Sequence, residues 1–377
     1  MEIYFDNAAT TPPLQHTAES LLGNPSSPHA MGIAIERKLT IARATIAEIL
    51  NCPHNEVIFT SGGTESNNLA LIGFAMANRR KDVTCMAQPW EHPSILEPLK
   101  FIKAHGLANV LIAPYEAWHN CKAHIRLAAI SHVNHETGDI NDISAMAAAL
   151  KKDNPHTVVL VDGVQGFCKE PANLSNIDMY SFSAHKCHGP TGTGGLMVRN
   201  NMRLVPLLYG GGQENKLRAG TENVSGIVHM ADTAKLLRQN QAGNHNHVAK
   251  IKLKLTELAN ELPNVTVNSQ HHNSSPYILN MSFLGIKGEI LVHLLSEKGI
   301  YVSMGAACRS RKNTKTALEA MSFAPEVANS AIRFSFSHLN TVEEANTAKQ
   351  IIIDCVTQMR NALGMYSGLN SKPSCML

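Results

Sequence analysis

The sequence has few charged residues, and their charges nearly cancel. Only 17% of its 377 residues are Asp, Glu, Lys or Arg, against roughly 25% in an average soluble domain. Together with the 44% of apolar residues, this composition excludes a disordered chain and favours a compact protein of about two or three cores. The net charge of +3 is spread along the chain, so it predicts neither direct nucleic-acid binding nor attraction to a membrane.

Long apolar runs and metal-ligand patterns are also missing. The N-terminus, MEIYFDNAATTPP, has no basic region followed by an apolar stretch, and no run approaches the ~20 residues of a membrane span. The eight cysteines form no C-x-x-C pair, and the 19 histidines show no H-E-x-x-H spacing. We therefore expect a cytoplasmic protein without a membrane anchor, a disulfide framework or a bound metal ion.

Short apolar runs alternate with helix-period segments between residues 15 and 238. Such alternation predicts an α/β protein with a mostly parallel sheet covered by helices. The polar segment QNQAGNHNH (239–247) predicts a linker or helix break before a second, smaller α/β unit. We place a large domain at 13–245 and a small domain at 1–12 with 246–377. The apolar runs are VIFT (57–60), VTCMAQ (83–88), VLIAP (110–114), LAAISHV (127–133), TVVLVDG (157–163), MYSFSAH (179–185) and GGLMV (194–198).

Two of these runs end in residues that can carry chemistry. Asp162 and Gln165 follow one strand, and Lys186 follows the next, before the glycine-rich HGPTGTGG. A carboxylate at the end of a buried strand needs a partner, and a protonated pyridine nitrogen is one such partner. Taken singly, Lys186 is more often a solvated loop charge, and Asp162 is as often a helix N-cap as a catalytic group.

The segment FTSGGTESNN (59–68) predicts a strand, a Gly-Gly turn and the start of a helix. Its Gly62, Gly63 and Thr64 can direct backbone N–H groups and a hydroxyl at a phosphate group, aided by the helix dipole. No G-K-[ST] follows, so the segment is not a P-loop. Taken alone, such a helix start is more often structural than phosphate-binding.

Several motifs together resemble those of the NifS/IscS-type cysteine desulfurases of the class V aminotransferase family. They occur in the family's order and with similar spacing over nearly the whole chain. They are DNAATTP (6–12), GNPSSPHAMG (23–32), TSGGTESNN (60–68), EH (91–92), HVNHETG (132–138), VDGVQ (161–165), SFSAHKCHGPTGTG (181–194), GGGQE (210–214), RAGTENV (218–224), GAAC (305–308) and SAIRFSF (330–336).

The resemblance implies the fold-type-I architecture of pyridoxal-phosphate (PLP) enzymes, with a seven-stranded sheet in the large domain. Lys186 corresponds to the lysine that binds the cofactor, and His92 to a histidine that stacks on its ring and assists proton transfer. Thr221 corresponds to a phosphate ligand supplied by the opposite subunit, which implies a homodimer. The implied cofactor-binding residues are Gly63, Thr64, His92, Asp162, Gln165, Ser183, His185, Lys186 and Thr221, and Asn24, Asn134 and Arg333 are the implied substrate-binding residues.

Cys308 is the residue that distinguishes the predicted cysteine desulfurase from other enzymes of the same fold. Small residues precede it and basic residues follow it, which favours a mobile loop and a reactive thiolate. The resemblance implies that Cys308 accepts sulfur from L-cysteine as a persulfide, releasing L-alanine. The long separation from Arg333 resembles the subgroup that passes sulfur to a scaffold or carrier protein, for iron–sulfur cluster assembly or another thiolation pathway.

Two other functions are compatible with parts of this pattern. A selenocysteine lyase, or another class V aminotransferase or β-lyase, would use Lys186 and Asp162 equally well. A carrier or regulatory protein could keep the fold without catalysis, although the complete set of motifs disfavours it. The sequence also departs from the family's usual forms, with SMGAAC in place of SSGSAC, DGVQG in place of DATQS, and His135 in place of an asparagine.

Overall fold

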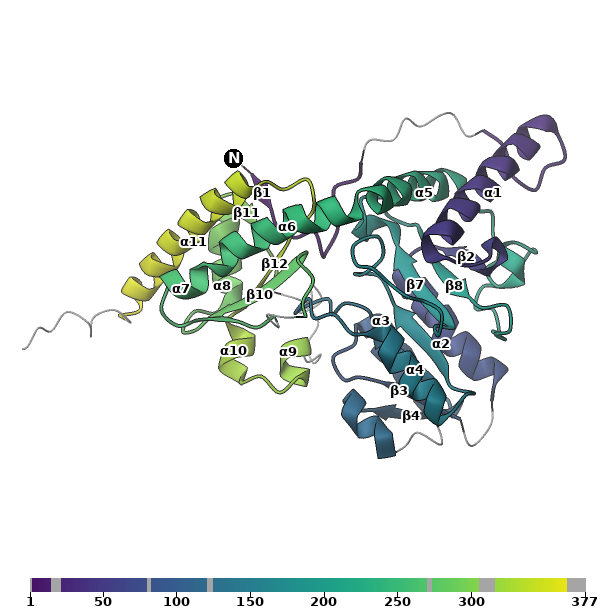
Figure 1. Ribbon diagram of the computed structural model, residues 1–377, viewed down its shortest axis with the longest axis horizontal. Helices are drawn as coiled ribbons and strands as arrows, with labels where there is room; N and C mark the ends of the chain where they lie inside the picture. Colours follow the sequence, from purple (N-terminus) through teal and green to yellow (C-terminus); the bar gives the residue numbers. More distant parts are fainter. Residues whose placement is uncertain are drawn as a thin grey trace, which may run out of the picture. The chain divides into compact units, whose positions relative to one another are not determined.

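The computed structural model describes residues 2–14, 22–79, 83–120, 125–269, 273–304 and 316–364 (Figure 1). The chain divides into two compact units. The larger unit comprises residues 8–135 and 139–245, and the smaller one residues 1–7, 136–138 and 246–377. Residues 8–12 group with the larger unit, whereas we expected them in the smaller one, because their backbone bonds to residues of the larger unit such as His185.

A seven-stranded sheet forms the centre of the larger unit, as predicted, in the order β2-β8-β7-β6-β5-β3-β4. Strand β8 pairs antiparallel with both of its neighbours, β2 and β7, and the other strand pairs of this sheet are parallel. Each predicted apolar run overlaps one of the strands, although β4 and β5 begin one and two residues before their runs. They are β2 (Val57–Thr60), β3 (Thr84–Ala87), β4 (Asn109–Ile112), β5 (Ile125–Ser131), β6 (Val158–Asp162), β7 (Met179–Ser183) and β8 (Gly194–Val198).

Helices cover both faces of this sheet, which explains why strands such as β6 are apolar on both sides. One face packs against α1 (Ala30–Leu50), α4 (Ile143–Asp153) and α5 (Val224–Gln239). The other face packs against α2 (Gly63–Ala77) and α3 (Pro93–Ala104). Short 3-10 helices lie at η1 (His54–Glu56), η2 (Tyr115–Asn120), η4 (Ala184–Lys186) and η5 (Glu214–Lys216).

The carboxyl ends of the central strands bring polar residues to one edge of the sheet. Ser131 of β5 pairs in register with Asp162 of β6, which pairs with Ser181 of β7. Residues paired in this way point to the same face of a sheet. That face is the one covered by α2 and α3, because Leu160, two positions before Asp162, packs in their apolar cluster. The starts of α2 and α3 therefore lie beside the polar strand ends.

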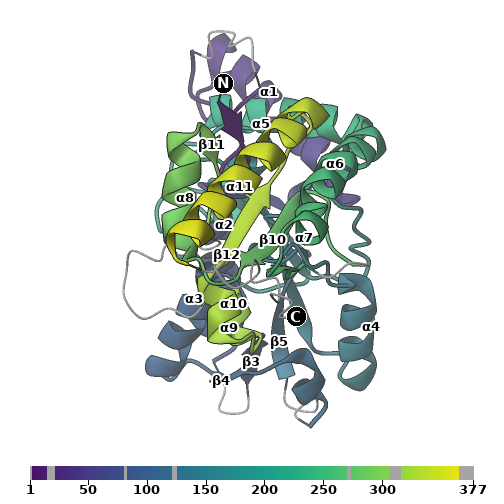
Figure 2. The ribbon, with the colours of Figure 1, turned by 90° about the vertical axis from the view of Figure 1, so that its left-hand side faces the viewer.

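The smaller unit is built on an antiparallel sheet with the order β12-β10-β9. Figure 2 shows the long helices α6, α8 and α11 around this sheet, and their apolar side chains form one core with it. The first strand, β1, pairs in parallel with β11. The elements are β1 (Ile3–Tyr4), α6 (Gln241–Thr256), α7 (Leu258–Glu261), β9 (Val265–Val267), β10 (Ile278–Phe283), α8 (Gly288–Glu297), β11 (Ile300–Tyr301), α9 (Ala317–Ala320), α10 (Pro325–Asn329), β12 (Ala331–Ser335) and α11 (Val342–Ala362).

For residues 239–247 we predicted a linker or a helix break, and the structure has the break and not the linker. Helix α5 ends at Gln239 and α6 begins at Gln241, so the break is confined to Asn240. The Asn240 carbonyl already accepts a hydrogen bond from the Asn244 N–H at 2.9 Å. Polar residues are tolerated on an exposed helical surface, which is why composition alone was misleading here. Within the described ranges, no helix has both the length and the apolar character needed to cross a bilayer.

Candidate active site

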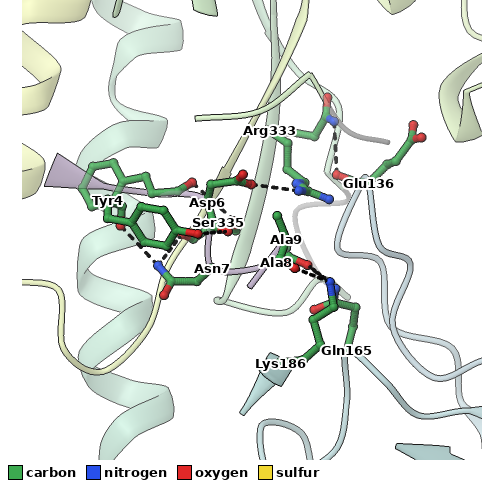
Figure 3. Close-up of polar contacts among 12 residues, drawn as sticks. Tyr4, Asp6, Asn7, Ala8, Ala9, Glu136, Gln165, Lys186, Arg333 and Ser335 are labelled. Atoms are coloured by element: carbon green, nitrogen blue, oxygen red, sulfur yellow. Dashed lines mark hydrogen bonds and ion pairs between the residues drawn. The ribbon is translucent and has the colours of Figure 1, made fainter. Parts of the chain in front are cut away.

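Lys186 lies directly after β7, in the short helix Ala184–Lys186. Its Nζ donates hydrogen bonds to the backbone carbonyls of Ala8 and Ala9, each at 2.7 Å (Figure 3). Gln165 Nε2 donates to the same Ala8 carbonyl at 2.8 Å. The N-terminal segment of the larger unit thus orients both the candidate cofactor lysine and the glutamine predicted beside the cofactor.

Asp162 ends β6 and is only 7% exposed. One carboxylate oxygen, Oδ1, accepts a hydrogen bond from the Val164 N–H at 3.0 Å. The other, Oδ2, accepts one from Asn67 Nδ2 at 2.9 Å. The first bond is a local turn contact and not the helix N-cap that we considered as the alternative, because turns and not a helix follow Asp162. Both donors are uncharged, so the carboxylate is oriented without being neutralised, which suits a cationic ring nitrogen.

His92 is the N-cap residue of α3 and is half-buried. Its Nδ1 accepts a hydrogen bond from the Ser94 N–H at 3.1 Å and lies 2.8 Å from Ser94 Oγ. Asn67 Nδ2 donates to the same Ser94 Oγ at 2.9 Å. The His135 ring meets the His92 ring edge-on, with centroids 5.0 Å apart. His135, one of the departures from the family pattern, is therefore in contact with a predicted catalytic residue.

The Gly-Gly turn before α2 forms a cradle beside the end of β7. Gly62 has a φ of +152°, which favours glycine, and a Cβ on Gly63 would lie 2.4 Å from Val164 Cγ2. A Cβ on Gly62 would lie 3.5 Å from Ser183 Oγ. The Ser183 hydroxyl is buried and has no hydrogen-bond partner among the described residues. Thr64, in the first turn of α2, is exposed.

His185 lies one residue before the candidate lysine, and its Nδ1 is 3.3 Å from Thr10 Oγ1. Burial, together with the positive charges of Lys186 and Lys169, lowers the pKa of its imidazole from 6.5 to about 4. The ring is therefore neutral in this environment and offers a single N–H donor to an anion.

These residues of the larger unit fit pyridoxal phosphate. The buried Ser183 hydroxyl and the first N–H groups of α2 suit a phosphate group, since helix N-termini favour anions. Asp162 supplies a buried carboxylate for the ring nitrogen, and Lys186 supplies the amine. All of them lie at the carboxyl ends of parallel strands or on the turns that follow, where ligands bind in α/β sheets.

The predicted substrate ligands of the larger unit are less closely joined to this group. Asn134 is buried, and its backbone N–H donates to the Asp139 carbonyl at 2.9 Å. Its side-chain Nδ2 donates to the Trp90 carbonyl at 3.4 Å. Asn24 and Thr221 are exposed on the surface of the larger unit. An exposed position is required of a residue that would serve the opposite subunit, as predicted for Thr221.

Arg333 belongs to the smaller unit, where it lies on β12 and is 3% exposed. Its Nη2 forms an ion pair with Asp6 Oδ1 at 2.9 Å (Figure 3). Its backbone exchanges hydrogen bonds with Ser303, which fixes its position on the strand. The predicted nucleophile, Cys308, falls in 305–315, outside the described residues.

Sequence reasoning missed three polar side chains beside Asp162 and His92. Two are Asn67 and Ser94, whose bonds are given above, and the third is Glu91. Its Oε1 accepts a hydrogen bond from the Ser131 N–H at 3.1 Å. The pKa of Glu91 is raised from 4.5 to about 8, because burial and the nearby charge of Asp162 together outweigh the lowering effect of this hydrogen bond. All three lie in or beside quoted motifs, but no spacing rule assigns them a role.

The departure DGVQG has a steric explanation. A Cβ on Gly163 would lie 2.0 Å from Tyr180 Cζ, and a Cβ on Gly166 would lie 2.2 Å from His132 Nδ1. Tyr180 and His132 are both buried, and the Tyr180 hydroxyl lies 3.2 Å from His132 Nδ1. This pair occupies the space that larger residues would need, so the two glycines accommodate it without altering Asp162 or Gln165.

Comparisons with known proteins agree with this geometry. The Aminotransferase class-V family model matches residues 3–347. The "Cysteine desulfurase IscS" of Methanosarcina thermophila is 32% identical over 95% of this chain and 93% of its own length. A solved "NIFS-LIKE PROTEIN" superposes with a TM-score of 0.88 at 33% identity, covering 95% of this chain and 100% of that one, which confirms the predicted fold class. A second solved structure, "SspA in complex with cysteine", gives a TM-score of 0.77 at 28% identity over 89% of this chain and 99% of that one. The chain therefore belongs to the class V aminotransferase family, which uses pyridoxal phosphate, and to its NifS- and IscS-like members.

Proposed function

We propose that this protein is a PLP-dependent cysteine desulfurase that converts L-cysteine to L-alanine and binds the sulfur as a persulfide on Cys308. The observation that carries the proposal is the grouping of Lys186, Asp162 and the unpartnered Ser183 hydroxyl at one edge of one sheet. Amine, carboxylate and phosphate-binding groups are the three attachments that this cofactor needs.

In this proposal the larger unit binds the cofactor by both of its ends. Gly63, Thr64, Ser183 and His185 contact the phosphate group, with Thr221 supplied by a second subunit of a homodimer. Asp162 and Gln165 would hold the ring, with His92 beside it, and Lys186 would supply the amine for its attachment. Once bound, pyridoxal phosphate provides an electron sink for the electrons released at the substrate α-carbon.

The chain's own residues then move protons and accept sulfur. Lys186 and His92 are the candidate groups for proton transfer at the substrate carbons. The Cys308 thiolate attacks the substrate sulfur; a sulfur–sulfur bond forms as the carbon–sulfur bond breaks, and the carbon takes a proton to give alanine. The overall exchange is balanced, since cysteine and the Cys308 thiol become alanine and the Cys308 persulfide.

Three residues are proposed to hold the substrate carboxylate: Asn24, Asn134 and Arg333. Nη2 of Arg333 pairs with Asp6, and its planar guanidinium has the fork geometry that suits a carboxylate. The cysteine-bound SspA structure supports L-cysteine as the substrate. A protein scaffold or carrier that receives the sulfur, for iron–sulfur cluster assembly or another thiolation pathway, and a cytoplasmic location remain predictions from the sequence.

The test is to incubate purified protein with pyridoxal phosphate, L-cysteine and a thiol reductant, and to quantify alanine and sulfide together. We expect equal yields of the two products from the native protein. Cys308→Ser should retain the cofactor and lose at least about 100-fold in sulfide formation, since it lacks the nucleophile. Lys186→Ala should lose turnover altogether.

Cys52→Ser is the matched control, because Cys52 is a partly exposed thiol at the end of α1 whose pKa burial raises to about 11. It should turn over cysteine like the native protein. Sulfide formation that is indifferent to Cys308 would contradict the persulfide role and point to a β-lyase. Activity with selenocysteine alone would instead indicate a selenocysteine lyase.

A further inference from the structure

A continuous set of hydrogen bonds joins His92 to Asp162 inside the larger unit. It runs from His92 Nδ1 to Ser94 Oγ (2.8 Å), from Ser94 Oγ to Asn67 Nδ2 (2.9 Å), and from Asn67 Nδ2 to Asp162 Oδ2 (2.9 Å). Asn67 is fully buried on α2, and Ser94 is 7% exposed on α3. The two residues that bridge the site therefore come from two helices that cover the same face of the sheet.

The chemistry of each partner fixes the direction of these bonds. A carboxylate only accepts hydrogen bonds, so the nitrogen of the Asn67 amide must face Asp162. That nitrogen carries two protons, one for Asp162 Oδ2 and one for Ser94 Oγ. The Ser94 hydroxyl accepts from Asn67, which leaves its own proton available for His92 Nδ1 if that nitrogen is an acceptor.

A second donor confirms this direction at the histidine. The backbone N–H of Ser94 points at the same Nδ1 at 3.1 Å, and a backbone N–H can only donate. Nδ1 therefore accepts from both groups and carries no proton. A neutral His92 must then carry its proton on Nε2.

We propose that Asn67 and Ser94 are positioning residues that hold His92 in the Nε2–H form and tie it to the Asp162 carboxylate. His92 then acts on the bound cofactor or substrate as a hydrogen-bond donor from Nε2, so that of the two candidate groups for proton transfer Lys186 would move the protons at the substrate carbons. Asn67 has a second effect, since it supplies one of the two N–H donors that keep Asp162 oriented. This inference rests on the proposed function, in which both residues contact the cofactor.

The first measurement concerns the apoprotein and needs no activity. Protein labelled with ¹⁵N-histidine reports the protonated nitrogen of each neutral ring, and the signals missing from His92→Gln identify residue 92. We expect the Nε2–H form at neutral pH in the native protein. A His92 protonated on Nδ1, or on both nitrogens, would overturn the proposal. This result needs no variant of Asn67 or Ser94 that folds.

The second measurement is the affinity of the apoprotein for pyridoxal phosphate, titrated by absorbance. Asn67→Ala should weaken binding about tenfold, because a hydrogen bond to a charged group is lost. Ser94→Ala should weaken it less, and the double variant should lose no more than Asn67→Ala, since the two residues act as one unit. Ser94→Thr, which keeps the hydroxyl, should restore the native value.

Asn68→Ala is the matched control, because Asn68 is the next residue of the same helix and its side chain bonds only locally, to the Thr64 carbonyl. It should bind the cofactor within about twofold of the native protein. Native affinity in Asn67→Ala, or fully additive losses in the double variant, would contradict the proposed coupling of His92 to Asp162 through Ser94 and Asn67. Failure of the native apoprotein to bind pyridoxal phosphate would instead contradict the proposed function.

Discussion

The two ends of the candidate cofactor site are prepared in different ways. At the ring end, Asp162 and His92 are already held by hydrogen bonds through Asn67 and Ser94. At the phosphate end, the Ser183 hydroxyl is buried without a partner in the described part of the chain. A buried polar group without a partner costs stability, so the phosphate end is incomplete until an anion binds. Orientation is thus built into the protein at one end and completed by the ligand at the other.

The ring end also contains a second buried carboxyl group besides that of Asp162, namely that of Glu91. Glu91 is buried; its Oε2 has no described partner, and its pKa is raised from 4.5 to about 8. Between these values folded Glu91 keeps a proton that the unfolded chain has lost. The contribution of Glu91 to the free energy of unfolding should therefore fall as the pH rises from about 4.5 to about 8, by up to about 1.4 kcal/mol per pH unit.

Urea unfolding of the apoprotein at several pH values measures this slope. Glu91→Gln should lack this contribution, so its stability relative to the native protein should increase with pH across the window. Glu97→Gln, on the exposed surface of α3, should keep the native pH dependence. A constant difference between Glu91→Gln and the native protein would show that Glu91 is already ionised when folded.

Removing the bridge should destabilise the protein before any cofactor is added. Asn67→Ala leaves Asp162 and Ser94 buried without one of their donors, which should lower the free energy of unfolding by about 1–3 kcal/mol. Urea unfolding of the apoprotein measures this loss, and Asn68→Ala should change it by less than about 0.5 kcal/mol. Equal stability of the two variants would mean that the ring end is not preorganised.

The smallest effect on stability is expected at the phosphate end. Ser183→Ala removes a hydroxyl that has no described partner, so the apoprotein should change by less than about 1 kcal/mol, while affinity for pyridoxal phosphate should fall about tenfold. Ser282→Ala is the contrasting control, since Ser282 bonds to both Asn268 and the Val327 carbonyl at 2.7 Å. A large loss of apoprotein stability in Ser183→Ala would show that the two ends do not differ.

The sheet was predictable because its strands are largely apolar runs, and each predicted run overlaps a strand. The position of Lys186, Asp162 and Ser183 at the carboxyl ends of strands was predictable because each lies at or just after the end of such a run, whereas their roles remain predictions from the family motifs. The linker was not, because composition cannot distinguish a polar loop from the exposed start of α6. The Asn67–Ser94 bridge was not predictable either, since it depends on the packing of two helices against one sheet face, a tertiary contact that leaves no periodic signal.

The bonds from Lys186 to the Ala8 and Ala9 carbonyls connect positions 178 and 177 residues apart. During synthesis the N-terminal segment is made first, but it cannot reach these partners until β7 and the turn after it have emerged. Closing so long a loop is slow, and contacts of this range form late in folding. The lysine acquires its carbonyl partners only when the larger unit has assembled, so the capacity to bind a cofactor should appear as one of the last events of folding.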